Sequence, residues 1–331
     1  MKHLPAAAAA AAAALLLAGC GTTEHASADS SPSVSPTGSA TTAGPVTLTD
    51  ATGATVRLDH PATRVVGTEW NVVEDLLTLG VAPVGVADVK GYKAWDTAVP
   101  LTNAPKDIGT RGEPSTDTIA ALSPDLVVAT TDLSAAVVKQ LRKAAPVLVV
   151  RSADAADQIG LMMKDLDLIA QATGTTAKAG TVRQAFEAKL AAGKQALASA
   201  GRTGAKVAPA DGYVVSNQVS VRPYTSGSLI GAVNERLGLR NAWTIKGDKD
   251  YGLATTDVEG LTGLGDIQFT YIANDTDGDP FAGALAKNAV WKSLPFVKDG
   301  HVHRLPDGIW MFGGPGSMEA YVDAVVDALT K

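Results

Sequence analysis

An amphipathic segment in the middle of the chain, residues 153–174, most constrains the fold that this sequence can adopt. Its apolar side chains recur every three or four residues with polar side chains between them, which predicts a helix that buries one face. The segment ends at Gly174, a residue that tolerates the left-handed backbone of a helix C-terminus. About twenty helical residues at roughly 1.5 Å each reach about 30 Å, the width of a small domain. We therefore expect this helix to bridge two lobes, with a cleft between them where small molecules bind.

Strand-like and helix-like segments alternate on both sides of this predicted bridge. A hairpin pattern at 46–58 comes first. The later strand-like runs are 64–68, 83–87, 125–129, 146–150, 210–216, 220–224, 267–272 and 301–305, and the helical runs are 71–79, 116–122, 134–144, 178–200, 229–237, 284–293 and 318–330. This alternation is typical of mostly parallel sheets. We predict an α/β fold with two Rossmann-like lobes, 46–152 and 175–331, joined by one long bridging helix and enclosing a ligand cleft.

The N-terminus has the pattern of an exported lipoprotein. Residues 1–19 predict a signal peptide, because they combine a positive start, an Ala-rich apolar run and small residues at the end. The apolar run is shorter than a membrane-spanning helix requires. The sequence Leu17-Ala18-Gly19-Cys20 resembles the bacterial lipobox, in which the cysteine is lipidated and becomes the first residue. An ordinary signal peptide with an incidental cysteine is the alternative. Residues 20–45, rich in Ser, Thr, Ala, Gly and Pro, are predicted to be a disordered tether.

Composition and motifs exclude several classes of function. A content of 46% hydrophobic and 19% charged residues is typical of a globular chain. The net charge of −6 is not typical of nucleic-acid-binding proteins, which present a basic face. Cys20 is the only cysteine, so no disulfide is expected within the chain. No nucleophile elbow, P-loop, dinucleotide fingerprint or HExxH motif occurs, and we expect no catalytic residues and no cofactor. His301 and His303 share a strand face but lack further ligands, so no protein-held metal is expected.

Most of the large aromatic residues fall where loops should leave strand ends. They are Trp70, Trp95, Tyr251, Trp310 and Phe312. In an α/β lobe those loops form the binding edge of the sheet. Arg111 lies in a Gly-rich loop, where its guanidinium can present paired donors to planar oxygen pairs.

Several motifs together resemble a known family. They are Arg64-Val-Val-Gly-Thr-Glu-Trp70, Glu74-Asp-Leu-Leu-Thr-Leu-Gly80, Pro83-Val-Gly-Val-Ala-Asp88, Ile108-Gly-Thr-Arg-Gly-Glu-Pro114, Asn241-Ala-Trp243 and 291–297 through Gly313. From about residue 46 onwards the chain resembles the class III periplasmic binding proteins, above all those that carry ferric hydroxamate siderophores such as ferrichrome and ferrioxamine. A ferric trihydroxamate already holds its iron, so such a protein needs aromatic walls and a cation but no metal ligand.

The resemblance implies a ligand site. In it Arg111 binds the hydroxamate oxygens, Trp70 and Trp95 line one wall, and Tyr251, Trp310 and Phe312 line the other. We also predict that Arg222, near the end of a strand in the second lobe, contacts the ligand; this residue is not implied by the resemblance. The chain departs from the family at two places. It has Thr130-Thr131-Asp132 where relatives carry a tyrosine, which predicts that a hydroxamate contact is missing or replaced. Tyr251 stands where close relatives have tryptophan.

The resemblance also implies partners. Family members dock on an ABC permease, which works with its ATPase, through one acidic residue on each lobe; Glu74 fits the first position and Glu235 the second. We expect a monomeric receptor on the outer face of the cell membrane, attached only through its lipid anchor.

Four alternatives remain open at this stage. The ligand could be ferric citrate or a catecholate, both strongly anionic and thus expected to need several arginines in the cleft. A corrinoid or haem carrier is a further binding alternative. An extracytoplasmic enzyme would place a nucleophile and a base together in the cleft. A structural or adhesive lipoprotein would fill the cleft with side chains.

Overall fold

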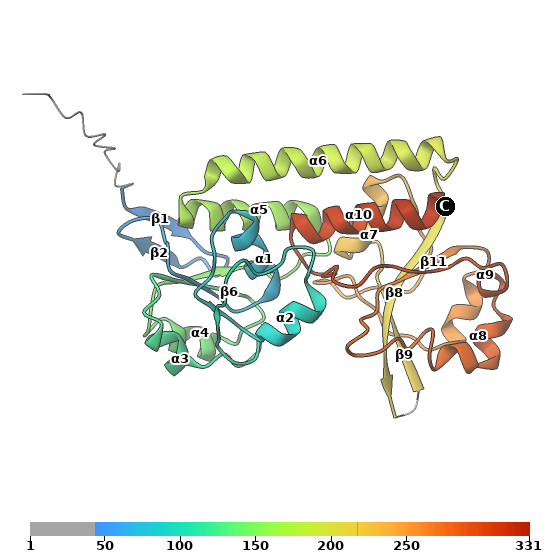
Figure 1. Cartoon of the computed structure of the whole chain (residues 1–331), viewed down its shortest axis with the longest axis horizontal. Coiled ribbons are helices and arrows are strands. Elements are labelled where there is room, and N and C mark those ends of the chain that lie inside the picture. Colours follow the sequence, from blue (N-terminus) through green and yellow to red (C-terminus); the bar gives the residue numbers. More distant parts are fainter. Residues whose placement is uncertain (1–43, 217) are drawn as a thin grey trace, which may run out of the picture. The chain divides into compact units, whose positions relative to one another are not determined.

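The fold is described from a computed structural model for residues 44–216 and 218–331 (Figure 1). The predicted signal peptide at 1–19, the predicted lipidation site Cys20 and the predicted tether up to residue 43 lie outside the described residues. Within the described ranges, no helix combines the length and apolar character needed to cross a membrane.

A β-hairpin opens the described chain. Strands β1 (Val46–Thr49) and β2 (Thr55–Leu58) pair antiparallel, as the sequence predicts. The carboxylate of Asp50 shapes the turn between them, because it accepts hydrogen bonds from the backbone N–H groups of Thr52 and Ala54.

The first lobe is built on a five-stranded sheet in which every neighbouring pair is parallel. The strands are β3 (Val65–Gly67), β4 (Gly85–Val86), β5 (Lys106–Asp107), β6 (Leu126–Thr130) and β7 (Val147–Val150), in the order β5-β4-β3-β6-β7. The connecting helices are α1 (Trp70–Thr78), α2 (Val89–Trp95), α3 (Thr116–Ala121) and α4 (Ala135–Leu141). The strand order reverses between β3 and β6, and ligands of such sheets bind outside the carboxyl ends at this point.

The second lobe contains another five-stranded sheet. Its strands are β8 (Lys206–Val215), β9 (Gln218–Pro223), β10 (Arg240–Asn241), β11 (Gln268–Tyr271) and β12 (Val302–Arg304). The path β10-β8-β11-β12 is parallel, and β9 pairs antiparallel with the far half of β8. The other elements are α7 (Leu229–Arg236), the 3₁₀ turns η1 (Glu259–Gly263) and η2 (Leu285–Lys287), α8 (Ala289–Ser293), α9 (Pro295–Lys298) and α10 (Pro315–Thr330).

These elements confirm the predicted α/β class with two lobes and parallel sheets, with local corrections. Helix α2 was not predicted from the sequence. The helix predicted at 284–293 is instead a 3₁₀ turn followed by the short helix α8. The reason is Asn288, whose side chain accepts hydrogen bonds from the N–H groups of Val290 and Trp291 and so starts a new helix.

The predicted bridging helix is shorter than expected and does not act alone. Helix α5 spans Gln158–Thr173, so the predicted start at 153 is wrong, whereas its end at Gly174, with a φ of 70°, is confirmed. Asp157 caps the helix by accepting a hydrogen bond from the N–H of Gly160. Sixteen residues reach only about 24 Å.

Two antiparallel helices join the lobes. At the start of α5 the Gln158 side chain donates to the carbonyls of Gly227 and Asp250 in the second lobe. At its end the carbonyl of Ala172 accepts from the N–H of Ala62 in the first lobe. Helix α6 (Thr176–Ser199) then runs back and packs along α10 (Figure 1). The single predicted bridge is therefore a pair of helices.

One hydrophobic core extends through both lobes. The same buried cluster contains Val128 of β6, Leu166 of α5, Ile230 of α7 and Tyr321 of α10. Because these side chains exclude water together, the lobes are held at a set separation rather than free to swing apart. Two smaller clusters complete the outer parts of the sheets.

Candidate ligand-binding site

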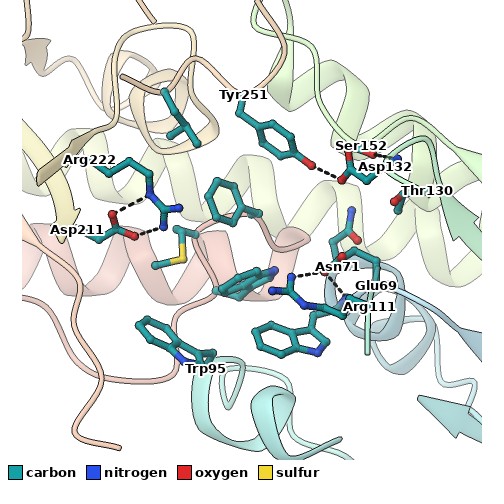
Figure 2. A pocket seen from close by; sticks show the side chains of 15 residues that line it. Glu69, Asn71, Trp95, Arg111, Thr130, Asp132, Ser152, Asp211, Arg222 and Tyr251 are labelled. Atoms are coloured by element: carbon teal, nitrogen blue, oxygen red, sulfur yellow. Dashed lines mark hydrogen bonds and ion pairs between the residues drawn. The ribbon is translucent and has the colours of Figure 1, made fainter. Parts of the chain in front are cut away.

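A cavity of about 400 Å³ lies between the two lobes, in the size range of small-molecule sites (Figure 2). Side chains from both lobes line it: Glu69, Trp70, Asn71, Trp95, Arg111, Thr130, Asp132, Ser152, Asp211, Arg222, Tyr251, Leu253, Trp310, Met311 and Phe312.

Loops at the carboxyl ends of parallel strands supply the first lobe's side of this cavity. Glu69 follows β3, Arg111 follows β5 and Asp132 follows β6. Ser152 follows β7. The topology of the sheet therefore brings together side chains that are up to 83 residues apart in the sequence, at the edge where ligands of such sheets bind.

The second lobe supplies a pair of charged strand residues and an aromatic loop. Asp211 on β8 and Arg222 on β9 are direct cross-strand partners, so their side chains share a face. Tyr251 lies on the loop that follows β10, and the segment 310–312 lies between β12 and α10.

Arg111 lies against the faces of two tryptophans. Its guanidinium carbon is 4.0 Å from the ring centroid of Trp70 and 5.2 Å from that of Trp310. One terminal nitrogen, Nη1, donates to Glu69 Oε1 at 2.7 Å. Its side chain is 34% exposed, which leaves donors of the guanidinium facing the cavity. The arrangement holds a planar cation in one orientation, as recognition of paired oxygen atoms requires.

Trp70 and Trp310 are largely core residues that present only part of each ring to the cavity. Their side chains are 3% and 6% exposed, and their ring centroids are 4.7 Å apart in an edge-to-face arrangement. The indole N–H of Trp70 donates to the carbonyl of Ala87. These rings therefore form the rigid floor that supports Arg111.

Trp95 is the more accessible tryptophan of the site. It is half-buried at the end of α2, and its ring centroid is 6.4 Å from that of Trp310. Its indole N–H donates to Asp277 Oδ2 at 2.8 Å, a contact between the first lobe and the second. This hydrogen bond sets the angle at which the ring faces the cavity.

Tyr251 and Asp132 close another side of the cavity. The hydroxyl of Tyr251, from the second lobe, donates to the carboxylate of Asp132 in the first lobe (Figure 2). Burial and this hydrogen bond both raise the pKa of Tyr251, so it stays a neutral donor. The ring packs edge-to-face on Phe312, with centroids 5.4 Å apart.

Arg222 is held by a carboxylate and a tyrosine. It forms two hydrogen bonds to Asp211, and the hydroxyl of Tyr224 donates to the same carboxylate at 2.9 Å. Its guanidinium carbon lies 5.4 Å from the ring centroid of Phe312. The second lobe thus carries its own arginine and aromatic pair, opposite the one built around Arg111.

The described residues contain no group of three or more His, Cys, Asp and Glu side chains arranged to hold a metal ion. His303 pairs instead with the side chain of Gln268, with 2.7 Å between His303 Nε2 and Gln268 Oε1, and His301 lies 3.4 Å from Asp266.

A family model described as periplasmic binding protein matches residues 65–308 of this chain. The chain belongs to the periplasmic binding protein family. Its two lobes and the cavity between them agree with that membership.

Three proteins show what this periplasmic binding protein is similar to. A Bacillus subtilis protein named "Putative ABC transporter substrate-binding lipoprotein YhfQ" is 29% identical over 307 residues, covering 86% of this chain and 88% of that protein. The iron(3+)-hydroxamate-binding protein FhuD of Escherichia coli is 25% identical, with coverage of 80% and 86%. The solved structure of the Fe³⁺–Desferal-bound siderophore-binding protein FhuD from Vibrio cholerae matches with a TM-score of 0.73 and 26% identity, covering 81% of this chain and 98% of that one.

All seven side chains predicted to contact the ligand of this binding protein lie together in the lining of the cavity. They are Arg111, Trp70, Trp95, Tyr251, Trp310, Phe312 and Arg222. Their contacts with a ligand stay predictions.

Part of the polar lining was not predicted from the sequence, namely Glu69, Asn71, Ser152 and Asp211. The sequence carries a usable signal for Glu69 and Ser152, because each lies two residues after a buried parallel strand. Asp211 carries no such signal, since its role depends on its cross-strand pairing with Arg222.

The prediction that Glu74 docks on a permease is wrong, because its side chain is completely buried. Glu74 Oε1 accepts from the backbone N–H of Ser317 at 2.8 Å, and Oε2 accepts from the Ser317 hydroxyl at 2.7 Å. Burial raises the pKa of Glu74, and the Ser317 donors oppose that effect. This carboxylate caps the N-terminus of α10 instead of facing a partner.

The second predicted docking residue, Glu235, lies on the surface. It is exposed near the end of α7, next to the ion pair between Arg236 and Glu187. Its position leaves the carboxylate accessible, and its docking role stays a prediction.

Proposed function

We propose that this chain captures a ferric hydroxamate siderophore and delivers it to an ABC importer. The observation that carries the proposal is Arg111, which lies against two tryptophan rings and faces a cavity shared by both lobes. Hydroxamate oxygens coordinated to iron are planar pairs of acceptors, which suit a guanidinium. The apolar chain of such a siderophore suits the aromatic rings around it.

Two of the relatives support the same ligand class. The FhuD protein of E. coli is named for binding iron(3+)-hydroxamate, and the V. cholerae structure holds Fe³⁺–Desferal. A cavity that is open and lined by aromatic rings also favours ligand binding over a purely structural or adhesive role, for which a filled cleft was expected.

The test is a fluorescence titration, since three of the five tryptophans line the cavity. Purified protein is titrated with ferrioxamine B, ferrichrome, ferric citrate and a ferric catecholate. We expect saturable quenching by at least one of the two hydroxamates and a large loss of affinity in Arg111→Ala. Arg57→Ala, which changes an exposed arginine on β2 outside the cavity, serves as the matched control. A response only to citrate or the catecholate would refute the proposal.

We further propose that the mature protein begins at a lipidated Cys20 and is attached to the outer face of the cell membrane. The lipobox-like residues 17–20 support this, as does the name of the B. subtilis relative, a substrate-binding lipoprotein. Replacing Cys20→Ser should move the protein from the membrane fraction to the medium or periplasm.

We propose that Glu235 contacts the permease of the importer. Its exposed carboxylate on α7 supports this role. Glu235→Ala should reduce siderophore uptake by cells without changing the fluorescence titration. Unchanged uptake would remove Glu235 from the docking surface.

A further inference from the structure

The cavity is lined by more negatively than positively charged side chains. Arg111 and Arg222 contribute two positive charges, and Glu69, Asp132 and Asp211 contribute three negative ones. Both arginines are already paired, Arg111 with Glu69 and Arg222 with Asp211. The remaining formal charge is that of one carboxylate, Asp132.

Asp132 is accessible and has no cationic partner of its own. Its side chain is exposed, and no lysine or arginine among the described residues forms an ion pair with it. The hydrogen bond from Tyr251 occupies one carboxylate oxygen, Oδ2. The backbone N–H of Asp132 donates to Ser152 Oγ, which fixes the loop that carries the carboxylate. A carboxyl group is thus held at the wall of the cavity with room for another hydrogen-bond donor.

The surroundings add further negative charge. Asp277, whose carboxylate accepts the indole N–H of the cavity residue Trp95, lies outside the lining itself, and the whole chain has a formal net charge of −6. Figure 2 draws Trp95 and Asp132 on opposite sides of the cavity. A strongly anionic chelate would therefore meet the carboxylate of Asp132 in a cavity whose described lining residues include no unpaired cation, whereas a chelate with a positive end would be attracted.

We propose that the siderophore carries a protonated amine beside its neutral ferric hydroxamate core, and that Asp132 binds this ammonium group. This inference rests on the proposed function and specifies, in addition, that the siderophore carries a positive charge. Arg111 contacts the iron-bound oxygens, and Asp132 selects the free end of the ligand. Ammonium is a compact donor of three hydrogen bonds, which suits a carboxylate oxygen that has no other cation.

The experiment uses two ligands that differ in one charge. Ferrioxamine B is a ferric trihydroxamate with a terminal ammonium, and its N-acetyl derivative has the same core without the charge. Tryptophan quenching at neutral pH and low salt should show about two- to fivefold weaker binding of the acetylated ligand, the range for an accessible ion pair. That difference should shrink at about 0.5 M salt, because mobile ions screen it.

The variant Asp132→Asn removes the charge and keeps an acceptor for the Tyr251 hydroxyl. It should bind both ligands with the same affinity, so that the preference for ferrioxamine B is lost. Asp59→Asn, which changes an exposed carboxylate outside the cavity, should keep the wild-type difference and controls for net charge.

The possible failures are distinguishable. Equal, salt-insensitive binding of both ligands by the wild-type protein would overturn the role of the ammonium while leaving the hydroxamate proposal intact. A difference that persists in Asp132→Asn would overturn the role of Asp132. Binding of neither ligand, nor of ferrichrome, would overturn the proposed function itself and this inference with it.

Discussion

At the scale of single residues, the geometry of Arg111 decides what the cavity can recognise. The guanidinium carbon lies over the Trp70 ring, 4.0 Å from its centroid, while one nitrogen pairs with Glu69. An arginine in this setting loses little freedom when it binds a ligand, because its partners already orient it.

Replacing Arg111→Lys should weaken hydroxamate binding although the positive charge remains. A lysine ammonium has no planar fork, so we expect about a tenfold loss of affinity, equivalent to about 1.4 kcal/mol. Fluorescence titration measures the loss, with Arg57→Lys as the matched control. Wild-type affinity in Arg111→Lys would mean that charge alone, and not the fork, recognises the ligand.

The residues of the site were predictable to different degrees. Arg111 and Trp70 stand in motifs that resemble a family, so their place in the cavity could be expected from the sequence alone. The pairs of Arg111 with Glu69 and of Arg222 with Asp211 could not, because each depends on the separation of two strands or loops in space. Glu74 shows the opposite failure: its motif was recognised, but its burial was not visible in the sequence.

At the scale of secondary-structure elements, the contact between α1 and α10 joins the two lobes. Glu74 on α1 caps α10 through Ser317, a residue 243 positions later in the chain. The N-cap residue of that helix is Gly314, which has no side chain that could cap it. A capping partner from the other lobe is therefore required, and no local pattern could predict it.

Replacing Glu74→Ala should destabilise the protein by about 2–4 kcal/mol. The change leaves the N–H of Ser317 without a partner inside the core, leaves its hydroxyl only the longer contact of 3.4 Å with Asp96 Oδ1, and also creates a small cavity. Denaturant-induced unfolding measures the loss. Glu113→Ala, on an exposed loop, should change the free energy of unfolding by less than about 0.5 kcal/mol. A similarly small effect at Glu74 would contradict the capping role.

Helix α5 should make stability depend on pH through Asp165. Burial raises the pKa of this side chain to about 7, against about 4 in an unfolded chain. The folded state then holds a proton that the unfolded state releases, so the free energy of unfolding falls as the pH rises from about 4 to about 7. The contribution of this one group approaches about 4 kcal/mol at the upper end.

In the variant Asp165→Asn, the free energy of unfolding should fall less between about pH 4 and about pH 7. Unfolding by denaturant at several pH values gives the comparison, with Asp59→Asn as the exposed control. Burial also raises the pKa values of Asp75 and Asp96, and these groups likewise lower the free energy of unfolding as the pH rises. The free energy of unfolding of the variant should therefore still fall with pH, but less steeply. A variant as steeply pH-dependent as the wild type would show that Asp165 is ionised in the folded protein.

At the scale of the whole molecule, the alternation of strands and helices predicted the two lobes, but not how they are joined. The sequence pattern at 153–174 suggested one helix, whereas α5 and α6 both run between the lobes. The predicted start of α5 was too early because residues 153–156 precede its N-cap, Asp157, and are not helical. The spacing of apolar residues does not distinguish that segment from the helix.

The shared core leads to a prediction about unfolding. The described residues from 44 onwards form one compact unit, and a single buried cluster runs from the hairpin residue Leu48 to Leu329 of α10. Neither lobe can open without exposing that cluster, so both lobes should unfold in one cooperative transition. Far-ultraviolet circular dichroism and tryptophan fluorescence should therefore give the same denaturation midpoint.

Ligand should move this single transition as a whole. A siderophore bound between the lobes stabilises only the state in which both are folded, by about 2.7 kcal/mol at a concentration one hundred times its Kd. Both optical signals should then shift together in the wild-type protein and remain in place in Arg111→Ala at the same ligand concentration. Two separate transitions, only one of which responds to ligand, would mean that one lobe folds independently and that the cavity is assembled only when the siderophore binds.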